Sequence, residues 1–328
     1  MSQRILIIGG GGFIGANLAR HLEENNVITI VHRPTTSLDN LENIRCTRLS
    51  GDINNPSFLE RAVIKQDIVF NLAACSSNLP MDRELRKRIN IEGAGQVADA
   101  VLRTKKARLV HVSSVAAIGI PGKNRILDET ASFNNSKDDY ALSKHLGEQA
   151  VLARVSQGLD AVIACPANVV GAFAMKKEQR ANFHAIASGK LRIYPPGGVC
   201  LVGVEDVIQG LVLCAHRGVA GHRYIIGGEN IPYRKYFAAI AAATGGTAPS
   251  IRLPRLLIYC IGIIANMLCR MGIRPPLSRD TCDMIRRNLY FSSQRAVNEL
   301  GYHFSGAEQV IMNTVHALAL GRERQENR

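Results

Sequence analysis

Short apolar runs alternate with stretches of helical periodicity along the first half of the chain. Most of the runs are rich in Ile, Val and Leu, and they fall at residues 5–8, 27–31, 46–49, 67–72 and 108–112. Between the first two runs, apolar residues recur three or four positions apart, as an amphipathic helix requires. Uninterrupted apolar runs are typical of parallel strands that are buried on both faces. The alternation therefore predicts an α/β fold built on a doubly wound parallel sheet.

Three glycines, Gly9, Gly12 and Gly15, follow the first run at intervals of three. Glycine permits a tight turn, lets the phosphates of a cofactor approach without a Cβ in the way, and lets the next helix pack closely on the strand. That helix begins near Phe13 and Ile14, and its N-terminus presents free N–H groups to an anion. We therefore expect these five residues to bind a dinucleotide, although a turn with a purely structural role can have the same sequence.

The end of the second run bears on which dinucleotide is bound. His32 and Arg33 stand there. A carboxylate at this place holds the ribose hydroxyls of NAD, whereas an arginine suits the 2′-phosphate of NADP. We expect His32 and Arg33 to bind the cofactor, and NADP(H) to be favoured over NAD(H). The alternative is that Arg33 is a solvated charge at the end of a strand.

Acidic and small residues follow the third and fourth runs. Asp52, with Ile53 beside it, is suited to accept a hydrogen bond from the adenine amino group. It is equally suited to cap the next helix, which Pro56 begins at the first turn. Ala73 and Ala74 are small enough for a cofactor to pass close by. We expect Asp52, Ile53, Ala73 and Ala74 to line the cofactor site.

Tyr140 and Lys144 are four residues apart at the start of a predicted helix and therefore lie on one face of it. A phenol with a pKa near 10 is a poor base at neutral pH. An ammonium one turn away, together with a cationic nicotinamide ring, favours the phenolate. A tyrosine and a lysine at this spacing are common by chance, so the pair has functional meaning only in company with other motifs.

Further motifs extend the pattern over about residues 5 to 230. They are Gly51-Asp52, Asn71 to Ala74, Asn90, Ser113-Ser114, Asp128 to Thr130, Cys165 to Gly171 and Val204 to Val207. With the glycine turn and the Tyr140/Lys144 pair, the sequence resembles the extended short-chain dehydrogenase/reductase family, also called the NAD-dependent epimerase/dehydratase family. Residues 221–230, 289–293 and 300–302 are similar to the branch that contains dihydroflavonol reductases and hopanoid-associated sugar epimerases.

The resemblance implies a Rossmann fold with a smaller C-terminal substrate-binding lobe. We expect residues 1–167 to form the dinucleotide-binding domain. Residues 168–328 are expected to form the substrate-binding lobe, interleaved with the last strands of the nucleotide domain. The resemblance also suggests a homodimer formed through two long helices, near Gly93 and Leu146.

The resemblance further implies a chemistry. Tyr140 gives a proton to the alkoxide that forms when hydride reaches a substrate carbonyl, and Ser114 hydrogen-bonds the same oxygen. Lys144 binds the nicotinamide ribose and makes Tyr140 more acidic, while Asn90 supports a water relay. By the same resemblance, Pro166 and Ala167 contact the cofactor and Asn168 contacts the substrate.

Three departures from the family pattern bear on the substrate. Cys165 stands where the family has arginine, Val170 where it has tyrosine, and Ile118 where a tyrosine commonly follows the active serine by four positions. The last departure weakens a nucleotide-sugar assignment. The leading hypothesis is an NAD(P)-dependent oxidoreductase that interconverts a ketone and a secondary alcohol on a small, moderately apolar molecule. The alternatives are a nucleotide-sugar epimerase or dehydratase, and a cofactor-sensing or assembly protein without turnover.

The composition of this 328-residue chain argues against nucleic acid and metal ions as partners. Its formal charge of +13 comes from scattered basic residues, with no nucleic-acid-binding module and no metal-ligand spacing. Eight cysteines without a Cys-x-x-Cys pair are typical of reduced thiols, so we expect a cytoplasmic protein. The first strand begins almost at Met1, and we expect no signal peptide.

Residues 256–271 are strongly apolar and flanked by arginines. The stretch is too short for a membrane span, and Asn266 interrupts it. It remains open as a buried helix, as the wall of a lipophilic substrate pocket, or as an interfacial helix that makes peripheral membrane contact.

Overall fold

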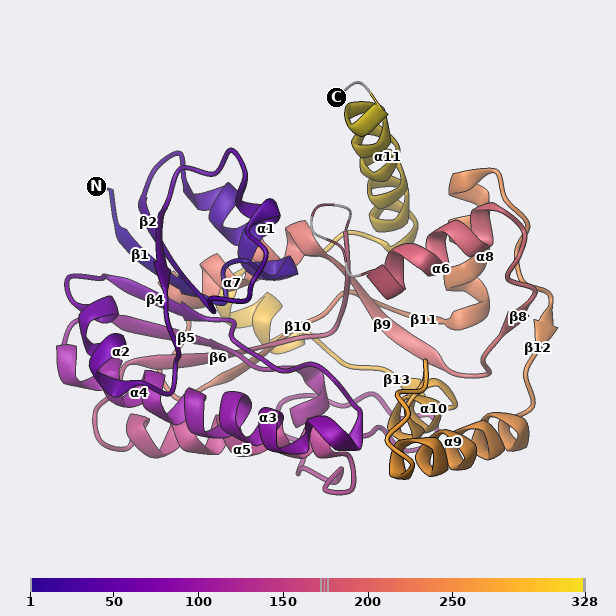
Figure 1. Ribbon diagram of the computed structural model, residues 1–328, viewed down its shortest axis with the longest axis horizontal. Helices are drawn as coiled ribbons and strands as arrows, with labels where there is room; N and C mark the ends of the chain where they lie inside the picture. The colour runs from indigo at the N-terminus through magenta and orange to yellow at the C-terminus, as the bar shows by residue number, and fades with distance from the viewer. Residues whose placement is uncertain (1, 172, 174, 176, 327–328) are drawn as a thin grey trace.

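The computed structural model describes residues 2–171, 173, 175 and 177–326, and it is built around a parallel sheet of seven strands (Figure 1). Their order in the sheet is β10-β6-β5-β4-β1-β2-β3. From β1 the chain first adds β2 and β3 on one side. It then crosses to the other side of β1 and adds β4, β5, β6 and β10. The predicted doubly wound sheet is confirmed, and the switch in direction lies between β1 and β4. The strands are β1 (Arg4–Ile8), β2 (Val27–His32), β3 (Thr47–Ser50), β4 (Ile68–Asn71), β5 (Arg108–Val112), β6 (Ala161–Pro166) and β10 (Arg223–Ile226).

Helices cover both faces of this sheet. On one face pack α1 (Phe13–Leu22) and α7 (Val204–Arg217), and on the other α2 (Pro56–Val63), α4 (Gly93–Thr104) and α5 (Asp139–Val155). Along β1, Ile5 and Ile7 join the first core while Leu6 and Ile8 join the second. This alternation is why the strand is apolar without interruption, because each of its faces meets a layer of helices.

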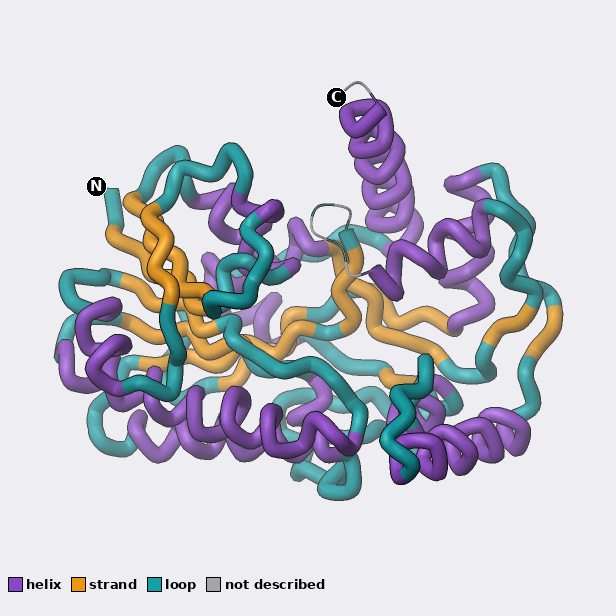
Figure 2. Tube along the Cα trace, in the orientation of Figure 1, coloured by secondary structure: helices purple, strands orange, loops and turns teal. Residues whose placement is uncertain are grey.

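A second lobe, with its own core, is built mainly from the C-terminal half (Figure 2). Its strands are β7 (Asn168–Val170), β9 (Gly198–Gly203), β11 (Glu229–Pro232) and β13 (Asn288–Leu289), with β8 (Ile193–Tyr194) and β12 (Ile251–Arg252) as a separate pair. Its helices are α6 (Lys177–Ala187), α8 (Tyr233–Thr244), α9 (Arg255–Arg270), α10 (Arg279–Ile285) and α11 (Ala307–Glu326). Strand β10 and helix α7 return from this half to the main sheet. The division at residue 167 stays a prediction.

The helical region before β5 differs from the sequence expectation. The periodicity suggests a helix over residues 81–102 that Gly93 and Gly95 interrupt. Instead, α3 (Arg83–Arg86) continues into a π-helical segment (Lys87–Glu92), and both glycines lie inside α4. A Cβ on Gly93 would lie 2.4 Å from the Cδ1 of Ile53, so this glycine permits close packing.

Two helical glycines make a matched pair for testing this packing. A Cβ on Gly147 of α5 would lie 2.2 Å from the carbonyl oxygen of Asn90, whereas the nearest atom to a Cβ on Gly95 is 3.7 Å away. We expect Gly147→Ala to lower the free energy of unfolding by roughly 1–3 kcal/mol, because backbone must move. Gly95→Ala should leave it unchanged or raise it by up to about 1 kcal/mol through helix propensity. Urea denaturation measures both, and equal effects would contradict the close approach.

Candidate functional site

The turn between β1 and α1 has a geometry that requires glycine. Gly9 has a φ of +82°, and its N–H donates to the carbonyl of Val31 at 2.9 Å. A Cβ on Gly9 would lie 2.9 Å from the nitrogen of Ala73, and one on Gly15 would lie 2.6 Å from the Gly9 oxygen. No side chain caps the start of α1. The turn therefore leaves room and a positive helix end for an anionic group.

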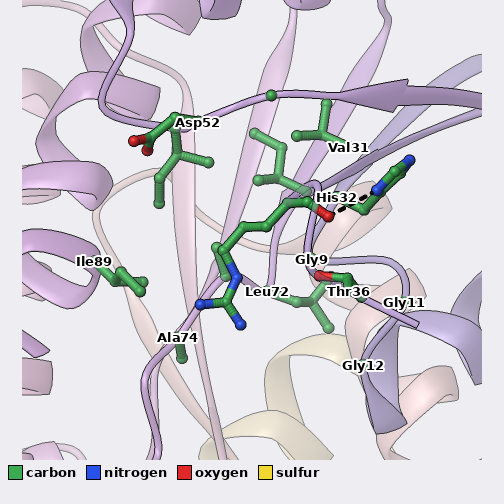
Figure 3. Close-up of a pocket in the computed structure, with 15 residues that line it drawn as sticks. Gly9, Gly11, Gly12, Val31, His32, Thr36, Asp52, Leu72, Ala74 and Ile89 are labelled. Carbon is green, nitrogen blue, oxygen red and sulfur yellow. Dashed lines mark hydrogen bonds between the residues drawn. The ribbon is translucent and has the colours of Figure 1, made fainter. Parts of the chain in front are cut away.

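A pocket opens over this turn at the carboxyl ends of β1, β2, β3 and β4 (Figure 3). Figure 3 shows Asp52, Ile89 and Ala74 on one side of it and His32 and Thr36 on the other. It gathers eight residues that the sequence predicts for the cofactor: Gly9, Gly12, His32, Arg33, Asp52, Ile53, Ala73 and Ala74. Thr36, a hydroxyl donor close behind Arg33 in the sequence, and Leu72 of the Asn71 to Ala74 motif also line it. Sequence reasoning missed two further lining residues, Gly11 and Ile89. We call this the turn pocket.

The polar groups of the turn pocket have defined partners. His32 Nδ1 donates to the carbonyl of Arg33 at 3.0 Å, the dashed line in Figure 3. Asp52 accepts from the Asn54 backbone N–H at 2.9 Å and pairs with Arg88. The Asn54 bond lowers the pKa of Asp52, so the carboxyl is ionised at neutral pH. Arg33 is exposed, with no carboxylate within 4 Å among the described residues.

One alternative for Asp52 is wrong. The side chain that caps α2 is that of Asn55, which accepts from the Phe58 N–H at 3.1 Å, and Pro56 occupies the first helical position. The Asp52 carboxylate forms a local turn with Asn54 instead, because it lies too far before the helix to reach its first N–H groups. A contact between Asp52 and adenine stays a prediction.

A second pocket continues from the turn pocket and shares Gly9, Gly12, Leu72 and Ala74 with it. It gathers the other residues predicted for catalysis, cofactor contact and substrate contact, Asn90 excepted: Phe13, Ile14, Gly15, Ser114, Tyr140, Lys144, Pro166, Ala167 and Asn168. They come from the start of α1, the ends of β5 and β6, the start of β7 and the first two turns of α5. We call this the central pocket.

Ser114 and Tyr140 meet in the central pocket. Ser114 follows β5, accepts the Ala116 N–H at 3.2 Å, and lies within hydrogen-bonding reach of the Tyr140 hydroxyl. Asp138 caps α5 by accepting the Ala141 N–H at 2.9 Å, which fixes the first turn of the helix and Tyr140 with it. Burial raises the pKa of Tyr140, and the bond to Ser114 opposes that rise.

The ammonium of Lys144 has a partner on strand β5: it donates to the carbonyl of Val112 at 2.8 Å. That Lys144 makes Tyr140 more acidic stays a prediction, while the bond with Ser114 lowers the pKa of the phenol. Burial lowers the pKa of Lys144 to about 8, against the opposing charge of Glu148. The ammonium is directed at β5 rather than along the helix toward Tyr140.

Glu148 is a buried carboxylate that sequence reasoning missed. Its side chain is fully buried, one turn beyond Lys144, and lies 3.5 Å from the guanidinium of Arg223 and 3.5 Å from the thiol of Cys165. Burial raises the pKa of Glu148, while Ser113, Arg223 and Lys144 oppose the rise. The spacing Tyr140, Lys144, Glu148 places all three on one helix face, which is the signal that identifies Glu148.

Asn90 lies behind the central pocket, in the π-helical segment. Its side-chain oxygen accepts the Cys75 N–H at 2.8 Å, and its amide donates to the Cys75 carbonyl and the Ser143 hydroxyl at 3.1 and 2.9 Å. These bonds hold the chain that leaves β4 against α5. A water relay through Asn90 stays a prediction.

A third pocket meets the central one at Ser76, Ser114, Tyr140, Ala167 and Asn168. Most of its wall comes from the second lobe and from the 115–120 loop. Apolar side chains dominate that wall: Val115, Ile120, Val199, Met284, Ile285, Leu289 and Phe291. Asn78 and Asn135 add polar groups. This substrate-side pocket therefore offers a largely apolar space that ends on the Tyr140 hydroxyl.

The comparisons with known proteins agree with this arrangement. A family model described as "NAD dependent epimerase/dehydratase family" matches residues 5–227. The chain belongs to the NAD-dependent epimerase/dehydratase family. Within the described residues of this family member, no group of His, Cys, Asp and Glu side chains could hold a metal ion, and no helix is long and apolar enough to cross a membrane.

Relatives match this family member almost from end to end. A putative dihydroflavonol 4-reductase of Synechocystis sp. is 30% identical, over 96% of this chain and 94% of its own. Sterol demethylase protein B of Methylococcus capsulatus is 26% identical, over 90% of this chain and 92% of its own. The crystal structure of gox2253 superposes with a TM-score of 0.84 at 30% identity, covering 98% of this chain and 99% of that one.

The titration of Lys144 gives a prediction for stability. Because folding lowers its pKa from 10.5 to about 8, the unfolded chain binds more protons between these values, and Lys144 adds stability as pH rises. Between pH 8 and 10 the protein should gain about 2 kcal/mol in free energy of unfolding relative to Lys144→Met. Denaturant unfolding at both pH values measures the gain.

The matched control is Lys106→Met, because the Lys106 side chain is exposed. That variant should keep the pH dependence of the unaltered protein. A Lys144→Met curve parallel to that of Lys106→Met would show that the buried ammonium does not titrate as described.

Proposed function

We propose that the protein is an NAD(P)-dependent oxidoreductase that interconverts a ketone and a secondary alcohol on a small, lipophilic molecule. One observation carries the proposal: the Tyr140 hydroxyl and Ser114 lie where the central pocket, continuous with the glycine turn, meets the substrate-side pocket. A substrate oxygen at that meeting point lies beside both hydroxyl groups.

The residues present fit a dinucleotide. Cβ atoms on Gly9 and Gly15 would fill the space over the turn, and the uncapped start of α1 suits a pyrophosphate. Gly9, Gly12 and Gly15 would hold the pyrophosphate, Asp52 and Ile53 the adenine side, and Pro166 and Ala167 the nicotinamide side. When bound, the nicotinamide supplies or accepts the hydride.

The chain's own residues handle the proton. In reduction, Tyr140 donates its proton to the substrate oxygen as negative charge develops there, and Ser114 donates a hydrogen bond to the same atom. In oxidation, Tyr140 takes the proton back. Lys144, on the same helix face as Tyr140, would bind a hydroxyl of the nicotinamide ribose. Its hydrogen bond to Val112 holds α5 in place.

Arg33 supports a preference for NADP(H). Its guanidinium lines the turn pocket, and no carboxylate lies within 4 Å of it among the residues described. The carboxylate of Asp52, in contrast, already has Arg88 and Asn54 as partners. A 2′-phosphate therefore has an available cation at the end of β2, in line with the wider NAD(P) dependence of the family.

A lipophilic substrate is supported by the wall of the substrate-side pocket and by two of the relatives, whose names refer to a dihydroflavonol and to a sterol. A nucleotide-sugar epimerase or dehydratase is the second candidate. It is favoured by the family description and by the four arginines of an outer pocket, which adjoins the substrate-side pocket at Asn78, Ile120, Asn135 and Met284. These arginines are Arg83, which pairs with Asp139, and Arg125, Arg279 and Arg287. A diphosphate group would need such cations.

The proposal also covers where the protein acts and what it contacts: the cytoplasm, a second copy of the chain and a membrane surface. All eight cysteines are free thiols, which favours the reducing cytoplasm. Leu146 is exposed on α5, in keeping with a homodimer through α4 and α5. The proposal also includes peripheral contact with a membrane through residues 256–271.

The function is tested at Tyr140. We expect Tyr140→Phe to lower turnover of a ketone panel by roughly 10²- to 10⁴-fold, since the general acid is lost. NADPH binding, measured by thermal shift, should change little. Tyr194→Phe serves as the control and should turn over normally. Unchanged turnover by Tyr140→Phe would exclude the proposed role, and turnover of nucleotide sugars alone would select the second candidate.

Cofactor choice is tested at Arg33. We expect Arg33→Ala to weaken NADPH binding about tenfold or more, because a charge-assisted contact to the 2′-phosphate is lost. NADH binding should stay within about twofold of the original. Fluorescence titration with both dinucleotides measures the ratio, and an equal loss for NADPH and NADH would refute a 2′-phosphate contact.

A further inference from the structure

Helix α9 packs on the rest of the protein through a narrow strip. Its buried residues are Ile258, Gly262 and Ala265, spaced four and three apart. A Cβ on Gly262 would lie 3.2 Å from the Cβ of Cys282 in α10, so this strip faces α10. Figure 1 shows the two helices side by side at the edge of the second lobe. The rest of the circumference of α9 lies outside that contact.

Large apolar side chains crowd this outer surface. Ile264 is 56% exposed, Met267 58% and Met271 73%. The full set, which we call the α9 face, is Leu256, Leu257, Tyr259, Ile261, Ile264, Met267, Met271, Ile273 and Leu277. Nine large apolar side chains exposed within 22 residues of the chain are typical of an interaction site, since in water they oppose solubility.

The segment that carries the α9 face contains basic but no acidic residues. Residues 251–279 include Arg252, Arg255, Arg270, Arg274 and Arg279 and no acidic residue. Arg274 pairs with Asp82, whereas Arg252, Arg255 and Arg270 have no carboxylate within 4 Å in the described part of the chain. Apolar side chains bordered by arginines are complementary to the hydrocarbon and headgroups of an anionic bilayer. A symmetric contact with a second copy would bring together two surfaces that both carry these arginines.

Helix α9 also contributes to a pocket next to the site. The outer pocket is lined by Asn266 and Cys269 of α9 and by Pro121 and Arg125 of the 118–127 loop. It shares Asn78, Ile120, Asn135 and Met284 with the substrate-side pocket, which Tyr140 lines. The two pockets therefore adjoin, and the outer one lies beside α9.

We propose that the α9 face docks on an anionic lipid bilayer, with α9 lying in the plane of the interface, and that a lipophilic substrate enters the outer pocket from the lipid. The sixteen residues of α9 span about 24 Å, short of a bilayer crossing, and their apolar side chains lie where a flat helix presents them to lipid. The docking stands on the surface alone, while the route of entry rests on the proposed function.

The docking is tested by flotation of the full chain with vesicles of phosphatidylcholine, or of phosphatidylcholine mixed with phosphatidylglycerol. We expect the protein to float with the mixed vesicles at low salt and to bind the neutral ones at least about tenfold less. Ile264→Glu combined with Met267→Glu should lower binding to mixed vesicles at least about tenfold. Ile64→Glu, at the residue directly after α2 that is also 56% exposed, is the control and should float normally.

Two outcomes would overturn the docking: a protein that stays at the bottom with both vesicles, or a double variant that floats as well as the control. If instead the α9 face is covered by a second copy, the double variant becomes monomeric in sedimentation and the original protein fails to float, which also refutes it. The entry route predicts that the double variant loses turnover of a vesicle-embedded ketone but keeps that of a water-soluble one. Equal turnover of both would reject the route, whereas failure of the Tyr140 test concerns the chemistry alone.

Discussion

Lys144 donates a hydrogen bond from its buried ammonium to the carbonyl of Val112, and this contact sets the position of helix α5 on strand β5. A buried ammonium without a partner is costly, so the helix is held at the register where the carbonyl is available. At that register Tyr140, one turn earlier, reaches Ser114, two residues beyond Val112. The meeting of the two hydroxyl groups therefore depends on how one charged side chain is satisfied.

The charge of Lys144 has a second support, the carboxylate of Glu148 on the same helix. Glu148 is buried one turn farther along α5 and faces Arg223 of β10, the last strand to join the sheet. Cys165, where the family pattern has arginine, lies against the same carboxylate, so the cation near Glu148 comes from a neighbouring strand instead. Cys165 thus departs from the family motif, and Arg223, more than fifty positions along the chain, supplies the positive charge beside Glu148.

The two lobes contribute different surfaces to the site. The main sheet reverses its direction of growth between β1 and β4, and that reversal opens the space over the glycine turn. The second lobe contributes apolar side chains around Tyr140 and an arginine-bordered helix at its edge. The polar side chains around Tyr140 thus come mostly from the main sheet and its helices and loops, whereas the apolar walls come mostly from the second lobe.

The sequence by itself determined the parallel sheet, the glycine turn, and the side chains gathered in the turn and central pockets. Those features follow from local rules: apolar runs buried on two faces, glycine where a Cβ has no room, and residues at the ends of adjacent strands. Only the tertiary structure decided that Lys144 bonds to Val112 and that Glu148 is buried beside Arg223. It also decided which face of α9 stays exposed. The physical reason is that these depend on competition among partners brought together by packing, and spacing along the chain does not record which partner wins.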